Sequence, residues 1–140
     1  MRWVAAFSLI LLLAAALAAC SGRDGRQSGE AAARADEAIN PLPANYKADV
    51  LAMLRVYLND PTNVREAGLT EPFIQPVGGR NRYAVCVRLS VRKSSGDYAA
   101  AKEHVAYFLH GRLDQMIEAN REQCEGVTYQ SFPEAEKLSR

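Results

Sequence analysis

Charge of one sign and catalytic motifs are what this sequence lacks most clearly. Its 140 residues include 17 Lys and Arg, 16 Asp and Glu, and only 2 His. Nucleic-acid-binding proteins usually present a strongly basic face, so the near-neutral balance predicts no nucleic acid partner. The sequence contains no block of like charges, so a polybasic membrane patch is not expected. Gly-x-Ser-x-Gly, His-Glu-x-x-His and phosphate-binding loops are absent too. We therefore expect a protein that is not an enzyme.

The two histidines do not predict a metal site. His104 and His110 fall in one apparent strand, where six residues of extended chain separate their α-carbons by about 20 Å. One ion could not bind both along such a strand, so each is expected at the surface or at the boundary of the core. The acidic residues are scattered and suggest no paired carboxylates. Neither a metal nor a cofactor is expected.

The first part of the chain looks like an export signal. Arg2 precedes an almost wholly apolar stretch, residues 4–17, which is shorter than the roughly 20 residues of a spanning helix. Leu17-Ala18-Ala19-Cys20 resembles the lipobox of bacterial lipoproteins. That resemblance implies cleavage before Cys20 and lipid on its sulfur, with the usual second acylation giving a stable membrane anchor. The alternative is an ordinary secretory signal with a chance cysteine at the cleavage site.

The residues after Cys20 predict a tether and a destination. Ser21 follows the cysteine where aspartate would favour the inner membrane, so an outer-membrane lipoprotein facing the periplasm is favoured. Residues 21–29 are polar and rich in glycine, and Pro41 and Pro43 interrupt any helix nearby. The tether predicted over residues 21 to about 45 has about 25 residues, for which the root-mean-square reach of a flexible chain is roughly 25–30 Å. The expected division is a signal peptide at residues 1–19, a lipidated linker at 20–45 and one domain at 46–140.

Hydrophobic periodicity predicts a helix at each end of that domain. Apolar residues recur at helical spacing over residues 46–58, and Asn59-Asp60-Pro61 ends this helix. A second, short helix is expected over residues 131–138, with Ser131 as a candidate cap and Pro133 in the first turn. Residues 62–69 show neither periodicity clearly and remain unassigned.

Between these helices the sequence predicts an antiparallel meander. Strict alternation of apolar residues marks the clearest strand, residues 82–92, of which one face is expected to be core. Residues 103–109 are expected to form the next strand. Residues 113–120 suit either a strand or a helix, and we favour a strand. Pro72 and Pro76 bracket Phe73 and Ile74, which indicates a short edge strand. The result is a small α+β fold whose helices cover one face of the sheet.

Part of the domain resembles a pattern found in small, uncharacterised bacterial envelope proteins. The shared pieces are an Asp-Pro break after a helix, a strand that bears a cysteine, a Lys-x-Ser-x-Gly-x-Tyr turn and an aromatic strand. In this sequence they are Asn59-Asp60-Pro61, residues 83–87, residues 93–98 and residues 105–108. The resemblance covers less than half of the chain. It implies the same fold and no activity.

Cys86 and Cys124 are the cysteines that remain once Cys20 is lipidated. In an oxidising compartment such a pair favours a disulfide, here between the central strand and the segment after the meander. Two buried free thiols are the main alternative. A redox or metal role is disfavoured, because no Cys-x-x-Cys motif is present to lower a thiol pKa.

The remaining candidates are surface residues. Basic side chains concentrate near the central strand, where they are expected mainly to form a solvated face and less often an anion-binding patch. The residues that we single out for a partner or ligand surface are Arg88, Arg92, Tyr98 and Phe73. We expect a membrane-anchored, non-enzymatic lipoprotein that binds another envelope protein. A periplasmic domain that binds a small molecule or a glycan is the alternative.

Overall fold

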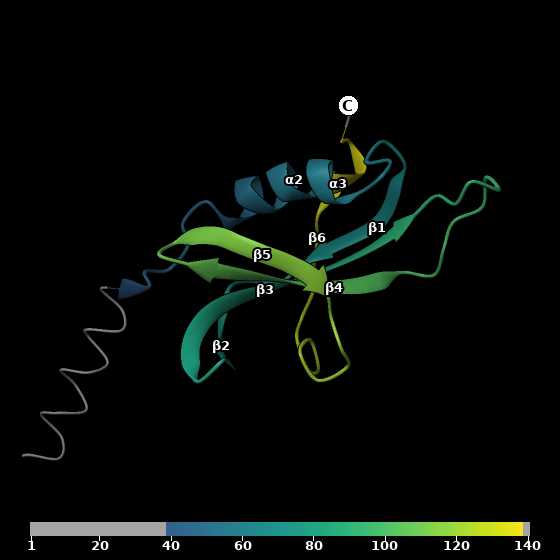
Figure 1. Ribbon diagram of the computed structural model, residues 1–140. Helices are drawn as coiled ribbons and strands as arrows, with labels where there is room; N and C mark the ends of the chain where they lie inside the picture. The colour runs from purple at the N-terminus through teal and green to yellow at the C-terminus, as the bar shows by residue number, and fades with distance from the viewer. Residues whose placement is uncertain (1–38, 139–140) are drawn as a thin grey trace, which may run out of the picture. The chain divides into compact units, whose positions relative to one another are not determined.

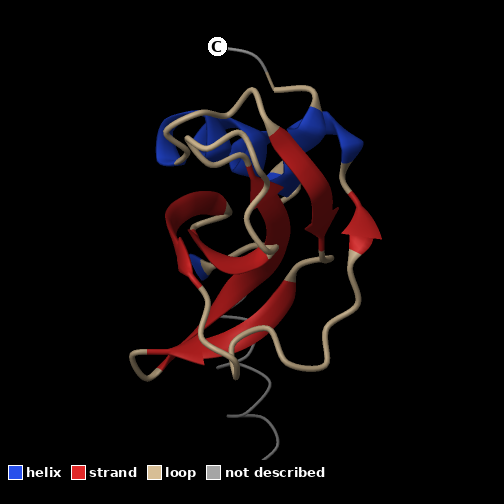
Figure 2. Ribbon diagram, turned by 90° about the vertical axis from the view of Figure 1, so that its right-hand side faces the viewer, coloured by secondary structure: helices blue, strands red, loops and turns tan. Residues whose placement is uncertain are grey.

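The computed structural model describes residues 39–138, so the predicted signal peptide and Cys20 lie outside the described residues. Two helices lie on one face of a six-stranded antiparallel sheet, as the two views agree (Figure 1; Figure 2). The strands follow the order β5-β4-β3-β1-β6, and β2 also pairs with β3. Neither helix of this part has the length and hydrophobicity that a membrane crossing needs. The predicted α+β fold is confirmed.

The predicted N-terminal helix is α2 (Tyr46–Tyr57). Val50 and Leu54, one turn apart, are fully buried against the sheet. Asp49 in the first turn and Arg55 in the last turn have the charges that the helix dipole favours at each end. Because the Asp-Pro break follows directly, the chain leaves the helix there and enters the sheet.

The clearest predicted strand is β3 (Arg80–Val91), which is the centre of the sheet. Its odd-numbered residues, such as Val85 and Val87, pack under the helices. Ala84 and Cys86 face the other way and are buried as well, in a second cluster. The sequence predicted one core face for this strand, and the structure has apolar packing on both.

The meander continues as predicted through β4 (Lys102–Leu109) and β5 (Arg112–Glu118). Both pairings are antiparallel, and a bulge interrupts the register of β5 beside Phe108. The ambiguous residues 113–120 are therefore mostly strand, as favoured. The buried Met116 shows why the pattern was unclear, because the other residues of β5 are half-buried or exposed.

Two short strands lie end to end along one edge of β3. β1 (Val64–Leu69) pairs with its C-terminal half, and β2 (Phe73–Val77) pairs with its N-terminal half. At the break, the Thr70 amide donates to the Cys86 carbonyl, and the Cys86 amide donates to Thr70 Oγ1, both at 3.0 Å. The predicted edge strand at residues 73–74 is confirmed as part of β2.

The strand β1 was not recognised in the sequence, and a bulge explains why. Arg65 pairs with Ser90 and Gly68 with Arg88, so two residues of β1 oppose one residue of β3. Glu66 in this bulge has a φ of +54°, a conformation that few residues other than glycine adopt. The extra residue disrupts the period of two that marks a strand in a sequence.

The C-terminal helix is shorter than expected. It is α3 (Pro133–Glu136), and β6 (Gln130–Ser131) precedes it. Ser131 is not the cap that the sequence suggested, because it pairs with Gly68 in extended conformation. Phe132 occupies the N-cap position with no side-chain cap. Pro133 lies in the first turn, as predicted.

Residues 119–129 cover the face of the sheet that the helices leave open. Figure 1 shows this loop on the opposite side of the sheet from α2 and α3. A disulfide joins Cys124 in the loop to Cys86 in β3, with 6.0 Å between the α-carbons. The predicted disulfide is thus confirmed. Ala119, Val127 and Tyr129 pack with it on the second apolar cluster.

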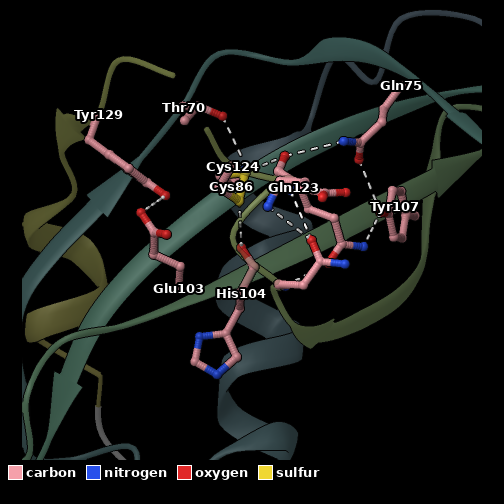
Figure 3. The surroundings of a disulfide bond; sticks show 11 residues. Thr70, Gln75, Cys86, Glu103, His104, Tyr107, Gln123, Cys124 and Tyr129 are labelled. Carbon is pink, nitrogen blue, oxygen red and sulfur yellow. Dashed lines mark hydrogen bonds between the residues drawn. A yellow bond between two sulfur atoms is a disulfide. The ribbon is translucent and has the colours of Figure 1, made fainter. Parts of the chain in front are cut away.

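A closed ring of three hydrogen bonds holds the same loop beside the disulfide (Figure 3). The Gln123 side-chain amide donates to the Tyr107 hydroxyl at 2.7 Å, and this hydroxyl donates to Gln75 Oε1 at 3.0 Å. The Gln75 amide in turn donates to the Gln123 carbonyl at 3.2 Å. Each group is satisfied by the other two, so the loop has one defined position over β2 and β4.

Removing the disulfide should destabilise the domain strongly. The bond closes a separation of 38 residues, for which the loop-entropy relation gives about 4 kcal/mol. We expect the Cys86→Ala/Cys124→Ala variant to lose about that much free energy of unfolding in denaturant titrations. The control is reductant, which should destabilise the parent protein and leave the double variant unchanged. A loss below about 1 kcal/mol would contradict a stabilising role for the bond.

Candidate functional site

A surface groove lies where β1, β3, β6 and α3 meet, and its volume is about 560 Å³. We call it the Arg88–Tyr129 groove. Its lining residues are Glu66, Ala67, Gly68, Arg88, Ala101, Tyr129, Gln130, Ser131 and Glu136. The bulge of β1 supplies one wall, because the extra residue turns the strand there. The covering loop supplies the aromatic side chain as it leads into β6.

Tyr129 is held in this groove by three neighbours on three adjacent elements. Its hydroxyl donates a hydrogen bond of 2.8 Å to Glu103 Oε1 on β4. The Arg88 guanidinium of β3 lies over the ring, 4.9 Å from the centroid. A Cβ added to Gly68 on β1 would lie 3.3 Å from the Tyr129 Cβ, a tight contact that would displace the tyrosine by a few tenths of an ångström. The ring therefore has a fixed place on the sheet.

Burial and the neighbouring carboxylate keep Tyr129 neutral. Burial is the larger cause of the rise in its pKa, and the hydrogen bond to Glu103 adds to it, because the neutral hydroxyl is the donor. The positive charge of Arg88 acts in the opposite direction. A phenol with a raised pKa donates a hydrogen bond at all physiological pH values. The hydrogen bond from the Tyr129 hydroxyl thus serves to position the ring.

The charged side chains of the groove differ in whether they form hydrogen bonds within the domain. Glu136 Oε1 accepts a hydrogen bond of 2.9 Å from the Ala67 amide, which ties α3 to β1. Arg88 contacts the Tyr129 ring and has no hydrogen-bonding partner among the described residues. Its five N–H donors therefore face solvent and can bind a carboxylate or backbone carbonyls of a partner. Glu66 also lines the groove and is exposed.

The four predicted surface residues do not converge. Arg88 lines the groove, whereas Arg92 lies just past the end of β3, about 13 Å away along the chain. The Nε of Arg92 donates to the Gly96 carbonyl at 2.9 Å. Arg92 lines a separate hollow of about 590 Å³, together with residues of the loops that follow α2 and β3. Tyr98 lies under the Arg65 guanidinium at 4.1 Å. Phe73 is half-buried against the disulfide cluster.

Sequence reasoning named Arg88 but missed its partners. From the sequence, Tyr129, Glu66 and Glu136 were not singled out for this site. They are 7 to 70 residues apart in the chain, so no local motif could join them. The one usable signal was Gly68, because a glycine inside an apolar strand often marks a bulge or a close approach.

The edge strand β2 offers a limited surface for pairing. It pairs with β3 on one side, and no described strand pairs with its other side. Ile74 is 58% exposed there. Pro76 follows it, and proline has no N–H to donate to an added strand. A partner strand could therefore pair with β2 only over a very short segment.

His104 is buried, contrary to the expectation of a surface or boundary position. Its exposed fraction is 5%, and its ring lies edge-on to Tyr57 of α2 with 5.3 Å between centroids. Figure 3 shows the ring on the side of β4 away from the disulfide. Nδ1 has no hydrogen-bonding partner in the described structure. The reason is register: His104 pairs with Val87 on the helix-covered face of the sheet.

Burial lowers the pKa of His104 below its usual value, and Lys102 lowers it further while Glu118 opposes the shift. Glu118 itself has a lowered pKa, because Lys102 donates to its carboxylate at 2.9 Å.

Among residues 39–138, no group of three or more His, Cys, Asp or Glu side chains is arranged to hold a metal ion.

Comparison with other proteins adds no relative to this description. No protein-family model, curated protein or solved structure matches the chain.

Lowering the pH below neutrality should destabilise the domain through His104. Because its pKa is lower in the folded state than the usual 6.5, the unfolded chain takes up a proton first as the pH falls. Stability present above pH 6.5 should therefore decrease toward pH 5, by at most about 1.4 kcal/mol per pH unit. Denaturant titrations at several pH values measure this slope.

The matched variants are His104→Gln and His110→Gln, since His110 is exposed. We expect His104→Gln to flatten the slope and His110→Gln to keep it. Equal slopes in the parent and in His104→Gln would contradict the assignment. The lowered pKa of Glu118 acts only at more acid pH, below its usual value of 4.5.

Proposed function

We propose that this chain is a lipid-anchored accessory protein of the cell envelope, which binds a partner protein through the Arg88–Tyr129 groove. The observation that carries the proposal is the fixed pair of Arg88 and Tyr129 at the surface. Arginine and tyrosine are the residue types that most often dominate the energy of protein interfaces. A ring already held in place loses little side-chain entropy when a partner binds.

The cysteines support the anchoring part of the proposal. The sequence contains 3 cysteines, and two of them form the disulfide of the domain. Cys20 is the third, and it stands in the segment that resembles a lipobox. A disulfide in so small a domain is typical of an exported protein, because the cytosol keeps most thiols reduced. Export, oxidation and lipidation at Cys20 are thus mutually consistent.

The geometry of the groove favours a peptide segment over a sugar. The Arg88 guanidinium lies over the Tyr129 ring, so this ring face is not available for stacking against a sugar. Beside the ring, the exposed β6 (Gln130–Ser131) pairs with β1, and no described strand lies on its other side. A partner segment can pair with this short edge while Arg88 binds its carbonyl or carboxylate oxygens.

The alternative is that the same groove binds a small molecule or a glycan. Its volume of about 560 Å³ falls within the range of ligand sites. The mixed charges of Glu66, Arg88 and Glu136 would then suit a ligand that bears both a cationic and an anionic group.

The anchor can be measured directly by the intact mass of the protein extracted from membranes. We expect a chain that begins at Cys20 and carries a lipid adduct, with a gain of two hydrogens after reduction of the Cys86–Cys124 bond. In the Cys20→Ala variant the lipid adduct should be lost and the effect of reduction retained. An unmodified Cys20 in membrane-extracted protein would contradict the anchor.

The partner surface can be located by photo-crosslinking in intact cells. A benzoylphenylalanine at Gln130, on the rim of the groove, should give one dominant protein adduct. The same probe at Ser95, in the turn after β3, is the control and should not give it. Because interface anchors typically contribute 2 kcal/mol or more, Arg88→Ala should lower the yield about tenfold or more.

Arg92→Ala is the matched control for Arg88→Ala, since Arg92 is an exposed arginine just past the end of β3 and outside the groove. We expect it to leave the yield unchanged. Similar losses in the two variants would show that the groove is not the contact. No protein adduct at Gln130, together with a bound saccharide or metabolite in the purified protein, would favour the alternative function.

A further inference from the structure

One end of the described domain combines the entry of the N-terminal segment with two tight turns. The His110 ring Nδ1 lies 2.7 Å from the Ile39 carbonyl, and the Asn40 amide contacts the Asn81 carbonyl at 3.5 Å. Both contacts join parts of the chain that are distant in sequence. His110 belongs to the β4–β5 turn, and Asn81 follows the β2–β3 turn. We call this surface, formed by residues 39–42, 80–81 and 110–112, the tether end.

Two large apolar side chains project from the tether end. Ile39 is 58% exposed and Leu42 is 59% exposed. Pro43, directly after Leu42, is fully buried, and Pro41 packs against Gly111. The backbone here is therefore fixed on the domain while the two apolar side chains face outward. Water is an unfavourable environment for such a pair, which suggests a covered surface.

Two arginines are chain neighbours of the residues that hold the N-terminal segment, since Arg80 precedes Asn81 and Arg112 follows Gly111. Arg80 begins β3 and Arg112 begins β5, and both are exposed without a hydrogen bond or ion pair to another described residue. Arg82, close by, is neutralised by Asp114 at 2.8 Å. Asp49 of α2 lines the same shallow hollow as Arg112 but forms no ion pair with it within residues 39–138.

We propose that the tether end rests on an anionic lipid surface, with Ile39 and Leu42 at the headgroup level and Arg80 and Arg112 on the phosphates. The inference rests on the proposed lipid anchor at Cys20. From Cys20 the chain reaches Ile39 through 18 intervening residues, and a flexible segment of that length would span roughly 25 Å. The first residues after Cys20 that the structure describes are those of the tether end.

With the lipid anchor on the same chain, a surface as small as the tether end is sufficient for docking on the bilayer. Two apolar side chains and two arginines would bind a bilayer only weakly as a free protein, since each basic residue contributes about a fivefold factor near an anionic surface. A lipid on the same chain turns docking into an intramolecular step at high effective concentration. The sequence shows no basic block, and the fold brings Arg80 and Arg112 to one end from different strands.

Docking at this end would also leave the Arg88–Tyr129 groove accessible. β3 begins with Arg80 at the tether end, and Arg88 lies eight residues farther along the strand, at most about 26 Å away. Figure 1 shows the loop between β3 and β4 at the far end of the sheet. A partner could therefore reach the groove while the tether end remains on the lipid.

Tryptophan fluorescence tests the proposal, because Trp3 is the only tryptophan in the sequence and lies in the leader that is removed. The purified lipidated protein carrying Leu42→Trp is mixed with vesicles of equimolar phosphatidylcholine and phosphatidylglycerol. We expect blue-shifted emission and quenching by brominated acyl chains. Ser95→Trp, in the turn at the other end of β3, is the control and should show neither effect.

Reversing the charges of the two arginines tests their role in docking. In the Leu42→Trp protein, Arg80→Glu/Arg112→Glu should lower the ratio of docked to undocked protein by about 20-fold or more, and pure phosphatidylcholine vesicles should give a comparably weak signal. Equal emission from Leu42→Trp and Ser95→Trp on anionic vesicles would overturn the proposal. A signal at Leu42 that is independent of charge would overturn the role of the arginines.

Flotation of the same samples separates this inference from the proposed function. Protein that floats with phosphatidylcholine vesicles is anchored by lipid whatever the fluorescence shows. A shifted Leu42→Trp emission without such flotation would support docking and contradict the anchor. Flotation without any emission change on anionic vesicles would support the anchor and overturn the docking.

Discussion

The apolar face of the sheet that the helices leave uncovered is the constraint on which the rest of the structure depends. A sheet with two apolar faces needs two covers, and the helices α2 and α3 supply only one. Residues 119–129 supply the other without regular secondary structure, so few backbone hydrogen bonds of their own hold them. The Cys86–Cys124 bond and the side-chain ring around Tyr107 replace those bonds. The position of Tyr129, and with it the groove, follows from this covering loop.

The groove exists because two irregularities of β1 coincide with the end of that loop. The bulge at Glu66 turns the strand, and Gly68 leaves room for an aromatic ring directly on the sheet. Arg88 is opposite Gly68 in the register and so covers the same ring. Local departures from a regular ladder thus create the exposed polar surface, while the regular part of β3 is buried on both faces.

The two proposals assign different parts of one small domain to different tasks. The apolar and basic residues at the tether end suit a lipid surface, and the fixed Arg88–Tyr129 pair suits a protein partner. β3 joins them as a rigid element, since its central residues are fully buried. A lipoprotein built this way would hold its partner-binding groove at a set height above the bilayer.

The sequence alone determined the features that depend on short-range pattern. Alternating apolar residues identified β3, β4 and β5, helical spacing and the Asp-Pro break identified α2, and two cysteines in an apparently exported chain predicted the disulfide. The strand β1, the burial of His104 and the extended state of Ser131 escaped it, because each depends on pairing with a distant strand. Only the tertiary structure could bring Gly68, Arg88, Glu103 and Tyr129 together, or place Arg80 and Arg112 at the same end. Register and bulges decide such neighbours, and a one-residue change in either would send the same side chains to the opposite face.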